Sequence, residues 1–172
     1  MTSYANPDAD RRKLKWIETP LDLAIEVLAL LALLASPVLI ALSWRDLPQR
    51  IPHHFNFAGN PDSWGPKWIL FLLPAISVVV YVILTVVARV PHRLNVPWEL
   101  TPENAERTYR IGMSLLRMLK AEVAILFTYI AWQTIRAAHQ QTFALGKFFL
   151  LVVIMTLLIT IVAHMLAAYR AR

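Results

Sequence analysis

The chain has 172 residues, of which 58% are hydrophobic and 16% charged, with a mean hydropathy of +0.52 and a formal net charge of +6 at pH 7. Soluble domains are about 45–50% apolar and about 25% charged, so a core of this size cannot hold the apolar excess, and the composition predicts a membrane protein. The absence of cysteine excludes disulfide frameworks, thiolate zinc sites and cysteine nucleophiles.

Four stretches that are apolar over most of their length predict four membrane-spanning helices, because a hydrocarbon core of about 30 Å needs about 20 apolar residues. The third stretch carries Arg117, Lys120 and Glu122 and needs residues before the uncharged run to reach length. The predicted spans are 21–44, 67–89, 111–136 and 147–169. The predicted fold is all-α, a single integral membrane four-helix bundle over 21–172 that follows a basic segment, 1–20.

The distribution of lysine and arginine predicts the orientation of these spans. Ten of them fall in the N-terminal segment, the link between the second and third spans, and the C-terminus, against five in the other two loops. The positive-inside rule then places both termini, including segment 1–20, in the cytoplasm. The basic residues are thus arranged by topology and not gathered on one soluble face, which argues against a nucleic-acid partner and for contact with anionic lipid.

The start of the third helix has a recognisable sequence. Thr101 is a residue type that caps helices, Pro102 suits the first helical position, and Glu103 places a negative charge at the positive end of the helix dipole. An unbroken helix from Pro102 to Ile135 would be about 51 Å long at 1.5 Å per residue and would extend beyond the membrane.

The loop 45–67, between the first two spans, has the most distinctive sequence. From Ile51 to Phe57 the side chains alternate between two faces, and Ala58-Gly59-Asn60-Pro61 is a turn sequence. We therefore predict an ordered extracytoplasmic loop with a short extended piece, a turn and a return into the second span. Its aromatic residues are expected to rest on the membrane interface.

This loop resembles the signature of the uncharacterised N-terminal domain of SdpI-like bacterial membrane proteins. The positions that carry the resemblance are Leu47, Pro48, Ile51, Pro52, His54, Phe55, Asn56, Gly59, Asp62, Trp64, Gly65 and Lys67. Further matches follow the second span at Asn95, Pro97, Thr101, Glu103 and Asn104. The resemblance implies a bacterial inner-membrane location and a role in immunity to a secreted peptide toxin, relayed to a cytoplasmic repressor. Because this chain carries the four-helix domain without the further C-terminal helices of the full-length form, the resemblance supports fold, location and loop more than immunity.

The loop supplies the first candidate site. Its motif residues are His54, Asn56, Gly59, Asp62, Trp64 and Lys67. His54 and Asp62 have the chemistry of metal ligands, but adjacent histidines on an extended chain point to opposite faces, so His53 and His54 are poorly placed to share an ion. We predict no metal and no cofactor. Two alternatives remain: Asn56 and Asp62 bond backbone donors in the turn, or a His54–Asn56–Asp62 network shapes the loop to bind a peptide or lipid headgroup.

The second candidate site lies inside the membrane. Glu26, Glu122 and His164 all fall in the inner half of the predicted spans, and ionisable groups at this depth usually face the bundle and pair. They are expected to form a polar cluster, with Glu26 or Glu122 near His164. The alternative is that these groups lie at the interface, and we expect Arg117 and Lys120 in particular to extend toward water.

The expected function is non-enzymatic: binding, immunity or signalling, in which the external loop recognises a peptide or a membrane partner. One alternative is an accessory subunit that docks on a larger membrane protein complex. Another is a small transporter or membrane enzyme that uses the inner polar cluster. The sequence has none of the phosphate-binding, zinc-protease or serine-hydrolase motifs that an enzyme of those classes would carry.

Overall fold

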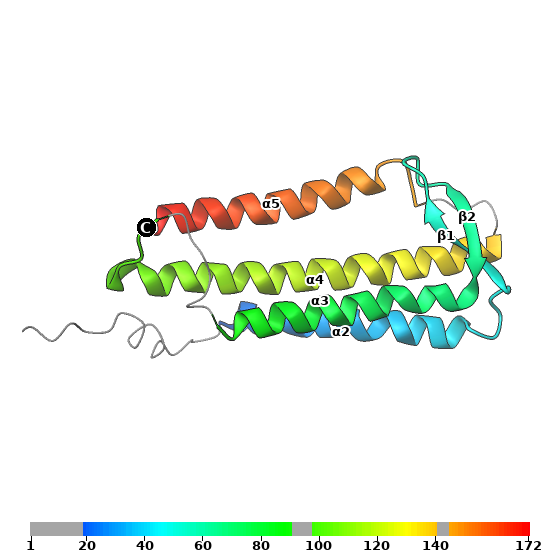
Figure 1. Ribbon diagram of the computed structural model, residues 1–172, viewed down its shortest axis with the longest axis horizontal. Helices are drawn as coiled ribbons and strands as arrows, with labels where there is room; N and C mark the ends of the chain where they lie inside the picture. The colour runs from blue at the N-terminus through cyan, green and yellow to red at the C-terminus, as the bar shows by residue number, and fades with distance from the viewer. Residues whose placement is uncertain (1–18, 91–97, 141–144) are drawn as a thin grey trace, which may run out of the picture.

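The computed structural model describes residues 19–90, 98–140 and 145–172, and within them four long helices lie along one axis (Figure 1). The helices are α2 (Pro20–Ser43), α3 (Leu72–Ala88), α4 (Pro102–Gln140) and α5 (Phe149–Arg170). They alternate in direction, so that the ends of α2 and α4 and the beginnings of α3 and α5 share one end of the molecule. The predicted count of four helices fits. Most of the basic segment 1–20, and Asn95 and Pro97, lie outside the described residues.

The prediction of an all-α fold needs one correction. The loop between α2 and α3 contains two antiparallel strands, β1 (Arg50–Phe55) and β2 (Pro61–Pro66), followed by a short 3₁₀ helix, η1 (Lys67–Phe71). This β-hairpin covers the end of the bundle where α5 begins (Figure 1). Pro74 lies in the first turn of α3, a position where a helix tolerates proline.

Three helical stretches are long and apolar enough to cross a membrane: Pro20–Ser43, Lys67–Ala88 and Phe149–Arg170. Large apolar side chains on these helices point outward, including Leu42, Val79 and Ile159, whereas the buried residue of α5 is Thr160. Large apolar groups outside and small or polar groups inside is the distribution expected of helices that pack in a lipid environment. The structure therefore has the features of a membrane protein.

Helix α4 is the centre of the bundle and contacts each of the other three helices. Its contact with α2 is the most extensive, because small residues on α2 let the two backbones approach: Ala29, Ala32 and Ser36 are buried. The Thr128 hydroxyl donates to the Ala32 carbonyl oxygen at 2.7 Å and ties the two helices together. Helix α5 packs mainly against α4, on the other side from α2 (Figure 1).

The helix beginnings confirm what the capping sequences predict. Thr19 and Asp22 form a reciprocal capping box at the start of α2. At the start of α4, the Asn104 side-chain oxygen accepts from the Thr101 backbone N–H at 2.9 Å. The Thr101 hydroxyl lowers the pKa of the Glu103 carboxyl by hydrogen bonding to it.

Two ion pairs join α2 and α4, and we call these four residues the charge ladder. Arg117 Nη1 lies 2.9 Å from Asp22 Oδ1, and one turn further along α4, Lys120 Nζ lies 2.7 Å from Glu26 Oε1. The spacing is i,i+4 on α2 and i,i+3 on α4, so both pairs lie on facing sides of the two helices. Lys120 is 3% exposed, so the expectation that Arg117 and Lys120 extend toward water is wrong.

Helix α3 completes the surroundings of Lys120. The Thr85 hydroxyl lies 3.2 Å from Lys120 Nζ, and the Tyr81 ring centroid lies 4.6 Å from it. The Tyr81 hydroxyl also donates to the Glu26 carboxylate. The ammonium is thus satisfied by groups from two helices, as a buried charge in an apolar environment requires.

We expect removal of one partner of this pair to be far more damaging than removal of both. Glu26→Leu leaves the buried Lys120 ammonium without its carboxylate and should lower the free energy of unfolding by about 3–5 kcal/mol. Adding Lys120→Met should recover most of that loss, because an apolar pair suits the same environment. Unfolding in detergent micelles measures both, and a double variant as unstable as Glu26→Leu would contradict the pairing.

Candidate functional site

The hairpin is irregular, and its irregularity decides where the two histidines lie. Pro52 pairs with Trp64 and His54 pairs with Ser63, so His53 is the extra residue of a β-bulge. The predicted strict alternation is therefore wrong: Ile51 and Pro52 are both buried, whereas His53 and His54 are both exposed. A bulge moves the following side chains out of their period-two order.

Lys67 fastens the base of the hairpin to the end of α2. Its ammonium donates to the Trp44 carbonyl oxygen at 3.0 Å and to the Leu47 carbonyl oxygen at 3.4 Å, and it lies 4.6 Å from the Trp44 ring centroid. Carbonyl groups at a helix C-terminus lack helical partners and carry the negative end of the dipole, so a cation is favoured there. The motif lysine thus has a structural role.

Trp64, another motif residue, contributes through its backbone and its ring. Its carbonyl oxygen accepts from Arg50 Nη2 at 3.0 Å, across the two strands. Its ring is partly exposed, and Trp68 in η1 is more so. Exposed aromatic rings at this end of the bundle agree with the expected interfacial aromatics.

The tip of the hairpin is held by Asn56 and Gly59. The Asn56 side-chain oxygen accepts from the backbone N–H groups of Ala58 and Asn60, both at 3.0 Å, which is the predicted turn role of this residue. Gly59 has a φ of +78°, and its carbonyl oxygen accepts from the Leu145 backbone N–H at 2.7 Å. The tip therefore docks on the segment that begins α5.

This docking depends on the missing side chain of Gly59. A Cβ atom there would lie 2.8 Å from the backbone nitrogen of Gly146. Gly146 itself has a φ of +93°. No motif in the sequence points to Leu145 or Gly146. The one indication is that Gly146 is one of only four glycines in the chain and comes just before the last apolar stretch.

His54 and Asp62 lie at the open edge of the hairpin. His54 Nδ1 lies 2.6 Å from Asp62 Oδ1, and the two side chains are 65% and 39% exposed. Of the two predicted alternatives, Asn56 bonds the turn and Asp62 bonds His54, so the three residues do not form a single network. The His54–Asp62 contact joins the two strands beside the bulge, and backbone pairs join them along the rest of the hairpin.

The His54–Asp62 pair faces a cavity of about 310 Å³ between the hairpin and the start of α5. Asn56 and Gly59 line it from the hairpin, and Leu145, Gly146, Phe149 and Leu150 line it from the other side. Phe57, beside the pair, is 87% exposed. An exposed polar pair and a bare aromatic ring around one cavity give a place where a ligand can be both packed and hydrogen-bonded.

The histidines do not converge on an ion. His53 Nε2 lies 3.2 Å from the Ser63 hydroxyl, whereas His54 turns to Asp62. Within the described part of the chain, no group of three or more histidine, aspartate or glutamate residues has a geometry that could hold a metal ion.

The inner polar residues divide into two separate groups. Glu26 belongs to the charge ladder between α2 and α4. Glu122 lies on the side of α4 that packs against α5, where its carboxylate accepts from the Thr160 hydroxyl. His164 Nε2 lies 3.3 Å from the Ser114 hydroxyl. Glu122 and His164 both contact Thr160, whose backbone carbonyl oxygen lies 2.8 Å from His164 Nδ1, whereas Glu26 is bonded to Lys120 on the other side of α4.

Comparison with known proteins yields short matches. A family model described as a domain of unknown function (DUF1648) matches residues 30–78, from within α2 through the hairpin into α3. An uncharacterised protein of Archaeoglobus fulgidus is 34% identical over 64 residues. That alignment covers 33% of this chain and 35% of the relative, so the chain spans about a third of its relative's length. No solved structure matches the chain.

The two glycines at the hairpin contact give a matched pair of variants. Gly146→Ala meets no atom within 4 Å, so its cost is that of a positive φ, roughly 1–2 kcal/mol. Gly59→Ala has the same φ cost and also places a Cβ against the Gly146 backbone, so it should lower thermal stability in detergent further. Equal losses from the two variants would contradict the docking of the tip.

Proposed function

We propose that this chain is an integral protein of the bacterial inner membrane that binds an extracytoplasmic ligand through the hairpin. Both termini lie in the cytoplasm in this proposal, so the hairpin faces outward. Its support is the charge bias of the loops and the three apolar helices.

One observation carries the binding role. The His54–Asp62 pair is exposed at the edge of a cavity, while separate contacts from Lys67, Gly59 and Asn56 hold the hairpin in place. Polar side chains on a fixed loop that the fold does not need are typical of binding sites.

The resemblance to SdpI-like proteins makes the proposal more specific. Its loop signature falls on the residues that build the hairpin: Gly59 and Lys67 anchor it, and His54 and Asp62 form the exposed pair. A role in immunity or signalling, in which the hairpin recognises a secreted peptide or a membrane partner, is the corresponding function. Each of these roles begins with recognition at the outer surface.

A second candidate function is that of an accessory subunit in a larger membrane complex. The observation in its favour is α5, which packs mainly on α4 and leaves large apolar side chains such as Leu151, Met155 and Ile159 outward. A helix so little covered can pack against a helix of another protein. Co-purification of one stoichiometric membrane partner, lost with Met155→Trp on α5 and kept with Asp62→Ala, would favour this function.

The exposed pair should matter for binding and hardly for stability. Asp62→Ala should change the free energy of unfolding by less than about 1 kcal/mol, as for other exposed ion pairs. A photoreactive residue in place of Phe57 should form a discrete adduct in intact membranes, and Asp62→Ala should abolish it.

Glu106→Ala is the matched control, since the Glu106–Arg110 pair is similarly exposed but lies at the other end of the bundle. This variant should leave the adduct unchanged. An adduct that survives Asp62→Ala, or loss of the folded protein in that variant, would contradict the binding role.

A further inference from the structure

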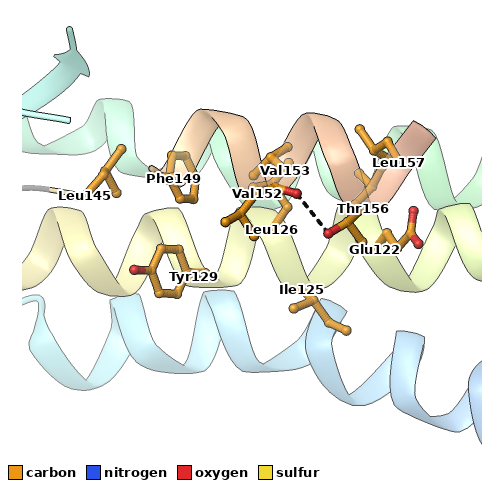
Figure 2. Close-up of a pocket in the computed structure, with 11 residues that line it drawn as sticks. Glu122, Ile125, Leu126, Tyr129, Leu145, Phe149, Val152, Val153, Thr156 and Leu157 are labelled. Atoms are coloured by element: carbon orange, nitrogen blue, oxygen red, sulfur yellow. Dashed lines mark hydrogen bonds between the residues drawn. The ribbon is translucent and has the colours of Figure 1, made fainter. Parts of the chain in front are cut away.

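A groove between α4 and α5 continues inward from the hairpin cavity. It has a volume of about 440 Å³ and shares Leu145 and Phe149 with that cavity. Figure 2 shows Leu145 at one end of the groove and Glu122 at the other, with side chains of the two helices facing each other between them. The two cavities adjoin at Leu145 and Phe149, and we call them together the path from the hairpin into the span of the helices.

The walls of this path change character along its length. The outer part has the polar groups of His54, Asn56 and Asp62. The inner part is lined almost entirely by apolar side chains, namely Val123, Ile125, Leu126, Phe149, Val152, Val153 and Leu157. The ligand that fits such a path has a polar head and an apolar tail.

The length of the apolar part matches one leaflet. From Phe149 to Leu157 the helix rises about 12 Å, and half of a hydrocarbon core is about 15 Å. The apolar lining ends at Glu122, whose Oε2 atom is buried and has no hydrogen-bond partner among the described residues. A carboxylate at this point limits how far an apolar chain extends.

A peptide suits the groove poorly. An extended peptide would need partners for each of its backbone N–H and C=O groups, and the groove offers few, because its polar side chains are Glu122, Tyr129 and Thr156. An acyl chain is narrow and has no polar group to satisfy.

We propose that the groove between α4 and α5 binds one acyl chain of a lipid-like amphiphile whose polar head lies against His54 and Asp62. The position of the head rests on the proposed binding role of the hairpin, whereas the position of the tail rests on the groove alone. Glu122 then sets the length of chain that fits. The hairpin would recognise the polar head of its ligand at the membrane surface, while the acyl chain of the ligand lies in the groove between α4 and α5.

The test uses the full chain in detergent and phosphatidylethanolamine with a photoreactive group on one acyl chain. Adducts located by mass spectrometry should concentrate on the groove-lining residues of α4 and α5. Val153→Trp fills the groove and should reduce them by about tenfold or more, which corresponds to about 1.4 kcal/mol. Thr156→Phe, at the rim of the groove, is a second blocking variant in case Val153→Trp does not fold.

Leu151→Trp is the matched control, because Leu151 is 55% exposed on α5 and does not line the groove. It should leave the adducts unchanged. Adducts spread evenly over the outer faces of α2, α3 and α5, or equal effects of Val153→Trp and Leu151→Trp, would overturn the acyl site. Glu122→Leu should shift the preferred probe toward longer chains, and an unchanged preference would overturn the length limit.

The hairpin is tested separately in the same assay. In the proposal, the double variant His54→Ala/Asp62→Ala weakens probe binding while the remaining adducts stay in the groove. Groove adducts at undiminished affinity in this variant would contradict the proposed function of the hairpin and support the acyl site by itself.

Discussion

Two cations on the central helix, α4, lie between packed helices, and α2 supplies an anion to each of them. Arg117 pairs with Asp22, and Lys120 pairs with Glu26. Removing one partner of a buried ion pair leaves an uncompensated charge at a cost of about 3–5 kcal/mol. Because α4 contacts all the other helices, a charge left unpaired in this ladder would disturb the packing of the whole bundle.

The position of the hairpin, at the other end of the bundle, also depends on α4. Helix α5 packs mainly on α4, and its first residues receive the tip of the hairpin through Gly59 and Leu145. Lys67 fixes the base of the hairpin to the end of α2. The hairpin is therefore held at both its base and its tip by helices that the ladder brings together. The exposed His54–Asp62 pair is left on a rigid support, which is the arrangement that lowers the entropic cost of binding.

Most of the helical frame could be predicted from the sequence. Apolar runs and the capping sequence at Thr101 give helix positions close to those observed, because these signals are local. The functional importance of the loop also follows from its composition. The role of Asn56 in the turn follows from the ability of its short side chain to reach the backbone two and four residues on.

The remainder depends on contacts between distant parts of the chain. The bulge at His53 follows from strand register, which the alternation of residue types does not fix. Gly146 meets Gly59 at the tip of the hairpin, and no pattern in the sequence near either residue predicts this contact. A similar depth predicts that Glu26 or Glu122 lies near His164, yet depth does not say on which side of α4 each residue lies. The facing sides of the helices decide that Lys120 is its partner.

The central claim is that α4 crosses the membrane although it carries these charges, and site-directed thiol labelling tests it most directly. The chain has no cysteine, so Ser63→Cys in the hairpin, Lys147→Cys before α5 and Glu103→Cys at the start of α4 each give a single reactive site. If α4 spans, an impermeant thiol reagent reaches Ser63→Cys and Lys147→Cys from the same side and Glu103→Cys only from the other. Labelling of Lys147→Cys from the side of Glu103→Cys would contradict the account.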